Sequence, residues 1–177
     1  MVMERDSKKF KVYDSKTGEC RYPKSLPGGG ETVVKPQGGA VIAAEFIEFE
    51  QQKYVVTTSN NNTLYFYDPM TDYRLVNTIN TSEIQMCVRW CGAPINMLFT
   101  AGLDHIVHAW DVKNFTEITM DRDEIDKNDE QEIKHTDFIM DILPIVSHNR
   151  LATASLDKNI CLWDLRKLKP LKLLKDH

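Results

Sequence analysis

A histidine, a serine and an aspartate near the end of the chain are residue types that could form a hydrolytic site. His135, Ser155 and Asp157 could act as base, nucleophile and orienting acid, and the chemistry would be acyl transfer. A serine nucleophile of this kind sits in a sharp turn flanked by glycines, which Ser155 lacks. The aspartate position also recurs in parts of the chain that have no matching histidine. The sequence therefore favours a structural role for these three residues.

The aspartate recurs because the sequence repeats itself. Three segments align when the chain is compared with itself: 54–69, 97–112 and 150–165, with a partial fourth copy at 8–20. Each has an apolar run, a small residue, an Asn or Asp turn residue and a closing aromatic residue followed by Asp. A spacing of roughly 40 to 50 residues between copies is typical of propeller blades.

Each repeat predicts short β-strands, because Val, Ile, Thr, Tyr and Phe alternate with polar residues between Asn, Asp, Gly and Pro. No helical periodicity competes with this pattern. The expected strands are 10–13, 41–46, 54–58, 64–67, 75–79, 84–90, 97–101, 106–110, 115–120, 138–143, 151–154, 160–163 and 171–174.

The last repeat, KHTDFIMDILPIVSHNRLATASLDKNICLWDL, resembles the WD-repeat family. His135 stands where the family has its Gly-His pair, Asp157 is the turn residue, and Trp163 with Asp164 closes the repeat. The earlier repeats depart from the pattern at Asn61, Tyr67 and Gly102. The repeats also resemble those of the long proteins that join WD repeats to EF-hands, such as WD repeat-containing proteins 49 and 64.

This resemblance implies an all-β fold of WD40 β-propeller blades, about three complete and two partial. The expected domain is a WD-repeat region at 8–177, with a partial blade at 8–24, a glycine-rich loop at 25–39, blades at about 40–80, 81–120 and 135–175, and an acidic insertion at 121–134. Because a propeller needs at least four blades, we expect an incomplete propeller and a longer parent protein.

The resemblance also implies a structural tetrad in the last blade. In this tetrad Asp157 accepts a hydrogen bond from His135, His135 meets Ser155, and Ser155 pairs with the indole of Trp163. Leaving a buried imidazole, hydroxyl or indole N–H unpaired costs about 1–3 kcal/mol. We expect the tetrad to fix the outer strands of the blade to the inner one.

The four cysteines show no metal-ligand spacing. Cys87 and Cys91 lie on one predicted strand, too far apart along it to share a tetrahedral metal easily. We expect reduced, buried thiols and neither a metal nor a cofactor. The sequence has no long apolar run and no secretory leader, so it predicts a cytoplasmic protein with no membrane partner.

The segment 121–132 has seven acidic and two basic residues, which argues against a nucleic-acid contact there. Four of its residues match ligand positions of an EF-hand calcium loop: Asp121, Asp123, Asp129 and Glu132. Ile125 and Asp126 break the pattern, because these positions need an oxygen ligand and a glycine. A solvated acidic loop is the simpler interpretation, and calcium binding is the alternative.

The expected function is a non-enzymatic protein–protein interaction scaffold. In the family frame, Phe138 and Met140 point out of one face, and Gln85 is their counterpart in the preceding blade. The expected partners are proteins and the remaining blades of a longer chain. The alternative is a calcium-responsive or ciliary and axonemal structural component. A propeller enzyme or a nucleic-acid reader is a remote alternative, because the repeats offer only scattered catalytic groups and the basic residues gather at the two ends.

Overall fold

The computed structural model describes residues 2–3, 10–13, 15–22, 38–118 and 133–175. These residues form one small three-stranded sheet and three four-stranded antiparallel sheets, without an α-helix in the described part. The expected all-β fold of blade-like sheets is confirmed. Among the described residues, no helix is long and apolar enough to cross a bilayer.

The small sheet contains β1 (Val2–Met3), β2 (Phe10–Tyr13) and β3 (Cys20–Tyr22). The first four-stranded sheet contains β4 (Val41–Phe49), β5 (Gln52–Ser59), β6 (Thr63–Asp68) and β7 (Arg74–Asn80). The second contains β8 (Gln85–Cys91), β9 (Met97–Gly102), β10 (Val107–Asp111) and β11 (Thr116–Ile118). The third contains β12 (Ile139–Ile145), β13 (Arg150–Ser155), β14 (Ile160–Asp164) and β15 (Lys169–Leu174). Two 3-10 turns, η1 (Pro69–Thr71) and η2 (Val146–His148), complete the elements.

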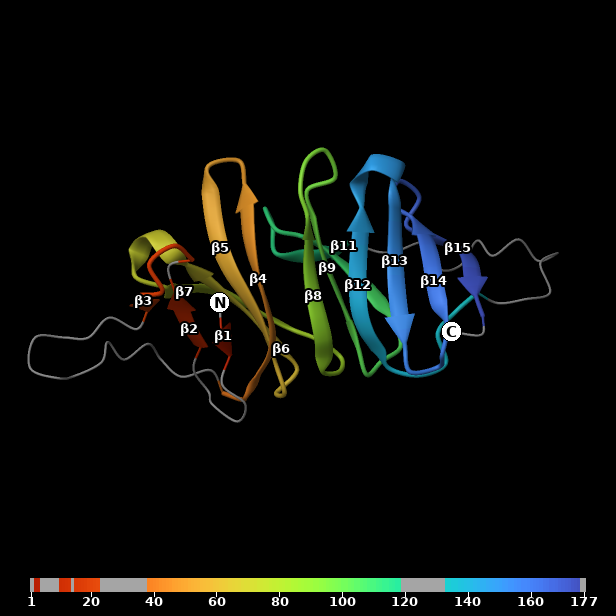
Figure 1. The fold of residues 1–177 in the computed structure, drawn as a ribbon, viewed down its shortest axis with the longest axis horizontal. Coiled ribbons are helices and arrows are strands. Elements are labelled where there is room, and N and C mark those ends of the chain that lie inside the picture. Colours follow the sequence, from red (N-terminus) through yellow and green to blue (C-terminus); the bar gives the residue numbers. More distant parts are fainter. Residues whose placement is uncertain (1, 4–9, 14, 23–37, 119–132, 176–177) are drawn as a thin grey trace, which may run out of the picture.

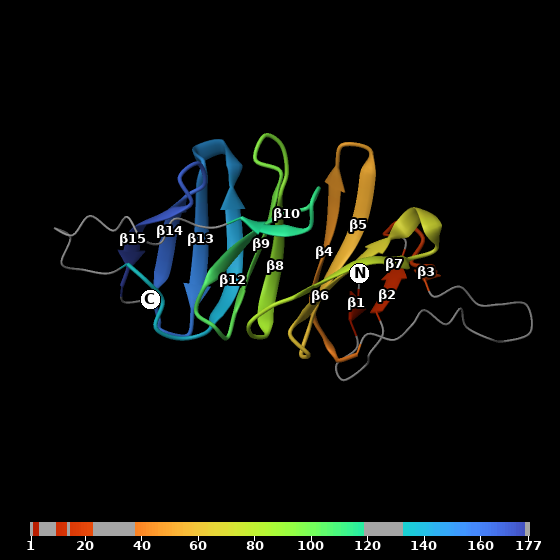
Figure 2. The ribbon, with the colours of Figure 1, turned by 180° about the vertical axis from the view of Figure 1, so that it is seen from behind.

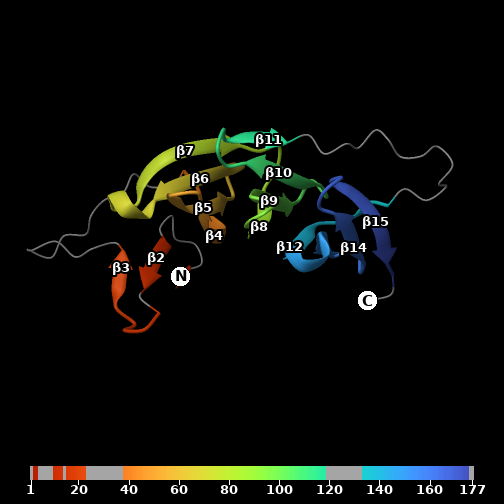
Figure 3. The same cartoon turned by 90° about the horizontal axis from the view of Figure 1, so that it is seen from above.

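The three four-stranded sheets stand side by side in chain order (Figure 1). Each is a simple meander, so its first strand is at one edge and its fourth strand at the other. Seen from above, the sheets form an arc with β4, β8 and β12 on the inner side (Figure 3). The outer strands β7 and β11 lie on the opposite side of the arc, and Figure 2 shows the molecule from behind.

The same backbone landmarks recur in all three sheets. A β-bulge interrupts the pairing of the first and second strands near Val41, Gln85 and Ile139. Because the bulges fall at equivalent places, they show which residues of the three sheets correspond. The three second strands have Thr57, Thr100 and Thr153 at equivalent positions. The three third strands have Tyr67, Trp110 and Trp163 at equivalent positions.

The turns between the second and third strands each contain a left-handed residue. Asn62, His105 and Lys158 have φ of 58°, 63° and 68°. The residue before each of these is Asn or Asp, whose side chain can bind the following backbone and hold such a turn. Asp104 Oδ1 accepts from Ile106 N at 3.2 Å, and Asp157 Oδ1 accepts from Asn159 N at 2.9 Å. This contact explains the recurring turn residue.

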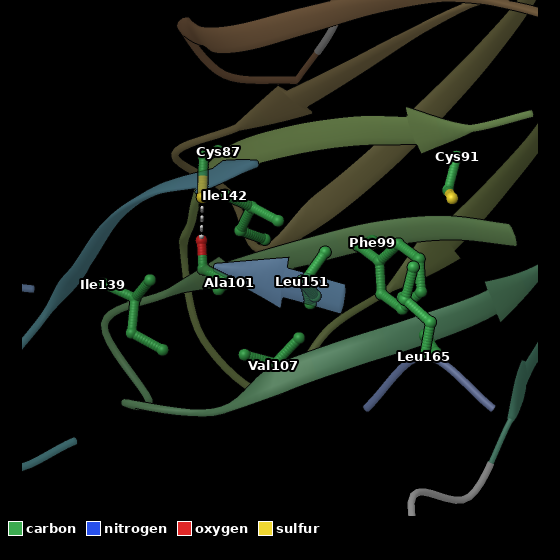
Figure 4. Packing of buried hydrophobic residues seen from close by; sticks show 10 residues of the cluster. Cys87, Cys91, Phe99, Ala101, Val107, Ile139, Ile142, Leu151 and Leu165 are labelled. Carbon is green, nitrogen blue, oxygen red and sulfur yellow. Dashed lines mark hydrogen bonds between the residues drawn. The ribbon is translucent and has the colours of Figure 1, made fainter. Parts of the chain in front are cut away.

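Apolar packing joins the sheets at two interfaces. Between the first and second sheets, Phe66 and Leu64 pack with Val88, Leu98 and other buried residues. Between the second and third, Phe99 and Ala101 pack with Ile139, Ile142, Leu151 and Leu165 (Figure 4). Burial of a Leu, Ile or Phe side chain contributes roughly 1.5–3 kcal/mol. These two interfaces therefore dominate the stability of the arc.

Polar contacts between the inner strands are weaker. Arg89 Nη2 on β8 lies 2.8 Å from Asp141 Oδ1 on β12, and the two side chains are 36% and 58% exposed. Exposed ion pairs contribute about 0–1 kcal/mol. On the other side of β8, Glu45 Oε1 accepts from Trp90 N at 3.5 Å. These contacts help to align the sheets, but they contribute little to the stability of the arc.

Some expectations fall on residues that the structure does not describe. The proposed calcium ligands Asp121, Asp123, Asp129 and Glu132 all lie outside the described residues. So do residues 25–37 of the glycine-rich loop and residues 121–132 of the acidic insertion.

Candidate functional site

A chain of hydrogen bonds crosses the third sheet. Trp163 Nε1 donates to Thr153 Oγ1 at 3.0 Å, and Thr153 Oγ1 lies 2.8 Å from His135 Nε2. His135 Nδ1 lies 2.8 Å from Asp157 Oδ2. A proton on His135 Nδ1 and a hydroxyl proton directed at Nε2 satisfy every group in the chain. Thr153 and His135 are 1% and 3% exposed, so the network is buried.

Ser155 is not part of this chain, so the expected contacts of Ser155 with His135 and Trp163 are wrong. Its Oγ donates to the carbonyl of Asp137 at 2.9 Å and accepts from Asp157 N at 3.1 Å. Thr153 and Ser155 are two residues apart and share one face of β13. Trp163 pairs opposite Leu151, which places its indole nearer to Thr153 than to the strand end. Thr153 therefore fills the role expected of Ser155.

The geometry also argues against a hydrolytic triad. Ser155 does not contact His135, so His135 cannot take its proton. Thr153 has the right neighbours, but its hydroxyl is buried, already bonded to Trp163, and 3.4 Å from the carbonyl of Cys161. A substrate carbonyl has no access to such a group. The network is structural.

Asp157 is held as a carboxylate at the end of this network. Burial alone would raise its pKa, but hydrogen bonds from Thr136 N, His135 and Asn159 N outweigh burial and lower the pKa below its usual value. Thr136 N donates to Asp157 Oδ2 at 3.0 Å. The ionised carboxylate therefore ties the segment before β12 to the β13–β14 turn.

The aspartate that closes each repeat caps the following turn. Asp68 Oδ1 accepts from Met70 N at 2.7 Å, and Asp111 Oδ1 accepts from Lys113 N at 2.8 Å. Asp164 Oδ1 accepts from Arg166 N at 2.8 Å, and this bond lowers the pKa of Asp164. A carboxylate is well suited to this position because it accepts several bonds from one turn.

This arrangement has a counterpart in known proteins. Residues 130–164 match the family described as WD40, the WD domain or G-beta repeat. The network of His135, Thr153, Asp157 and Trp163 thus lies in a segment that matches this family. Comparison with curated protein sequences gives no match. The narrower resemblance to WD-repeat proteins that carry EF-hands stays a prediction.

Two solved structures of WD-repeat proteins have a similar fold. The RRP9 WD40 repeats superpose with a TM-score of 0.65 at 9% identity, over 81% of this chain and 41% of that chain. U3-55K superposes with a TM-score of 0.64 at 9% identity, over 81% of this chain and 42% of that one. At this sequence identity the similarity shows the fold alone. The chain spans about two fifths of the length of these proteins.

The second sheet keeps the tryptophan contact and the turn aspartate Asp104. Trp110 Nε1 donates to Thr100 Oγ1 at 2.9 Å. Gln85 Nε2 donates to Asp104 Oδ2 at 3.1 Å, which supplies the turn carboxylate with a donor. Gln85 is 1% exposed, so its expected place on the outer face is wrong. The register puts Gln85 at the position of the inward-pointing Ile139.

The first sheet uses tyrosines in the equivalent contacts. Asn61 takes the turn position, and its Nδ2 donates to the hydroxyl of Tyr65 at 2.8 Å. Gly38 N donates to the same hydroxyl at 3.2 Å. Tyr67 stands in place of the tryptophan and is 1% exposed. The first sheet thus closes the same turn with a different set of partners.

His108 is a buried histidine that the sequence did not single out. Its Nε2 lies 2.8 Å from Asp104 Oδ2 and its Nδ1 lies 2.6 Å from Glu117 Oε1. Its ring stacks on the ring of Trp110, with 5.8 Å between the two ring centroids. The available signal was its place two residues before Trp110, which puts both side chains on one face of β10.

Three large apolar side chains are exposed at one end of the third sheet. Phe138, Met140 and Leu156, the Phe138 cluster, are 38%, 41% and 54% exposed. Leu156 N donates to the carbonyl of Phe138 at 3.0 Å, and the Phe138 ring lies 5.7 Å from the ring of His105. Phe138 and Met140 are thus exposed at the surface, and Leu156 joins them from the β13–β14 turn.

The three cysteines of the four-stranded sheets are buried thiols. Cys87, Cys91 and Cys161 are all unpaired. Burial raises the pKa of the Cys87 and Cys161 thiols to about 12. Such thiols stay protonated near neutral pH and are poor nucleophiles and metal ligands. Within the described part of the chain, no three His, Cys, Asp or Glu side chains gather in a way that could hold a metal ion.

Proposed function

We propose that this chain is a non-enzymatic scaffold module that binds protein partners through the Phe138 cluster. The observation that carries the proposal is the joint exposure of Phe138, Met140 and Leu156 at one end of the third sheet. Neighbouring exposed apolar side chains are typical anchors of protein interfaces. A protein partner would gain free energy by burying them.

The buried network supports this proposal because it holds the cluster in place. Leu156 lies between Ser155 and Asp157, and both neighbours bond to the segment 135–137 that precedes Phe138. Hydrogen bonds therefore join the segment before Phe138 to the turn that carries Leu156. A surface that is rigid before binding loses less conformational entropy when a partner docks.

The finer parts of the expected function stay predictions. A calcium-responsive role would depend on residues 121–132, which lie outside the described part of the chain. The ciliary and axonemal role and the cytoplasmic location rest on the resemblance alone. The expected remaining blades of a longer parent chain are also a proposal.

Affinity capture with matched variants tests the proposal. The 177-residue chain would be immobilised as wild type, as the double variant Phe138→Ala with Met140→Ala, and as Met70→Ala. Met70 is 78% exposed on η1 of the first sheet and serves as the matched apolar control. Loss of two anchors should weaken a specific partner at least about tenfold, which corresponds to 1.4 kcal/mol.

Proteins captured by the wild type and by Met70→Ala, but lost from the double variant, would support the proposal. The same set of captured proteins from all three baits would contradict it. Circular dichroism of the double variant would verify that its sheets remain folded.

A further inference from the structure

The second sheet contains a cluster of ionisable groups that the other two sheets lack. His108 on β10 lies between Asp104, in the β9–β10 turn, and Glu117, on β11. The side chains of His108 and Asp104 are 9% and 7% exposed, and that of Glu117 is 45% exposed. The position of His108 is taken by Tyr65 in the first sheet and by Cys161 in the third, so the cluster is specific to the second sheet.

Both ring nitrogens of His108 face carboxylate oxygens. A carboxylate can only accept, so each nitrogen must carry a proton for both contacts to be hydrogen bonds. The geometry therefore fits an imidazolium between two carboxylates. A neutral ring would leave one nitrogen lone pair 2.6 or 2.8 Å from an anionic oxygen, which is repulsive.

We propose that Asp104, His108 and Glu117 form a pH-sensitive latch that holds the outer strand β11 against β10 while His108 is doubly protonated. When His108 loses a proton, the latch opens on the side of Glu117. The rest of the sheet keeps its pairing.

The partners of the two carboxylates decide which contact is lost. Asp104 is nearly buried and also accepts from Ser82 Oγ at 3.2 Å, Gln85 Nε2 at 3.1 Å and Ile106 N at 3.2 Å. Glu117 is about half exposed, so water can replace His108 as its donor. The remaining ring proton therefore stays on Nε2, facing Asp104, where the loss of a donor would cost more.

The groups around the ring also set the direction of the pH dependence. Burial would lower the pKa of His108, but hydrogen bonds to Asp104 and Glu117 outweigh burial and raise the pKa above its usual value. The charged groups that face the ring are these two carboxylates, while Gln85 from β8 contacts Asp104 and Trp110 stacks on the ring. The latch is therefore closed below the raised pKa and opens as the pH rises through it.

The contact joins two strands that also pair through their backbones. In the described residues, the pairing of β11 with β10 joins Glu117 to Trp110, Thr116 to Asp111 and Ile118 to Ala109. Glu117 is thus the residue of β11 whose side chain reaches His108, and the latch adds a side-chain contact to this pairing.

Nuclear magnetic resonance of the 177-residue chain between pH 5 and 9 tests the latch. The titration midpoint of His108 should lie above the usual value of about 6.5, and both ring nitrogens should carry protons below that midpoint. Amide exchange in β11, corrected for its intrinsic pH dependence, should accelerate through the same midpoint. Protection should fall by about tenfold for each unit by which the pKa of His108 exceeds its value with the latch open. A midpoint at or below about 6.5, or unchanged protection across this range, would overturn the proposal.

Two variants separate the latch from ordinary stability. Glu117→Gln keeps the size of the side chain and removes its charge, so the His108 midpoint should fall and the pH step in β11 protection should disappear. Glu83→Gln removes an exposed carboxylate just before β8 and should change neither readout. Persistence of the pH step in Glu117→Gln would also overturn the proposal.

Discussion

The hydroxyl of Thr153 lies 3.0 Å from the indole nitrogen of Trp163, and Thr100 and Trp110 make the same contact at 2.9 Å in the neighbouring sheet. The contact joins the second strand to the third strand inside each sheet. In the third sheet it continues through His135 to Asp157 and so reaches the base of the Phe138 cluster. The predictions below follow from this chain of contacts and from the packing around it.

Thr153→Val should destabilise the third sheet more than Ser155→Ala. The valine keeps the shape of the side chain but leaves Trp163 Nε1 and His135 Nε2 unpaired in a buried site, at a cost of about 1–3 kcal/mol. The partners of Ser155 are at the strand end, where water can replace the lost hydroxyl. Urea unfolding of both variants measures the difference. A larger loss from Ser155→Ala would mean that the serine, and not the threonine, connects the network.

Asp157→Ala and Trp163→Phe should each destabilise the third sheet by about 1–3 kcal/mol, because each leaves buried polar groups without a hydrogen-bond partner. Asn61→Ala, at the equivalent turn of the first sheet, should cost less, since Asn61 is exposed and Gly38 N also binds the Tyr65 hydroxyl. Thermal melting combined with hydrogen exchange at each sheet distinguishes these losses. Equal losses from Asn61→Ala and Asp157→Ala would contradict the network.

Phe99→Ala should destabilise the chain far more than Arg89→Ala. Phe99 is fully buried between the second and third sheets, and removal of a buried phenylalanine costs about 3–5 kcal/mol. Arg89 forms an exposed ion pair with Asp141, for which about 0–1 kcal/mol is expected. The two variants would be compared by chemical unfolding at low and high salt. A comparable loss from Arg89→Ala would show that inner-strand charges hold the arc.

Acid should weaken the third sheet through Asp157. The pKa of this carboxyl is lowered in the folded state, so its stabilising contribution is complete above the usual aspartate pKa of about 3.9 and is lost as the pH falls through the lowered value. The stability difference between wild type and Asp157→Asn should therefore shrink below about pH 4. Urea unfolding from pH 7 to pH 3 measures it, and a difference that stayed constant would argue against an ionised Asp157 in the network.

The sequence predicted the fold well because the repeat is encoded locally. Alternation of apolar and polar residues marks each strand, and an Asn or Asp marks the turn between the second and third strands of each four-stranded sheet. The observed strand ends differ from the predicted ones by a few residues at most, as at β4, which continues to Phe49. The short strands β1 and β3 were not predicted, because two or three residues show no periodicity.

The contacts between side chains were harder to predict. Thr153 and Ser155 carry the same hydroxyl on the same face, so only the register against Trp163 decides which of them is used. Gln85 was misplaced because the register aligns it with the inward-pointing Ile139 and not with Phe138 or Met140. His108 was missed because Glu117 is across the sheet and has no fixed spacing to it along the chain.

Photo-crosslinking from a defined position most directly tests the claim that the Phe138 cluster binds protein partners. A photoreactive amino acid would replace Met140 in one chain and Met70 in another, and crosslinked proteins would be compared by mass spectrometry. The account predicts that specific proteins crosslink at position 140, that Phe138→Ala abolishes these crosslinks, and that position 70 yields none of them. Identical crosslinked proteins at both positions, or crosslinks at position 140 that survive Phe138→Ala, would contradict it.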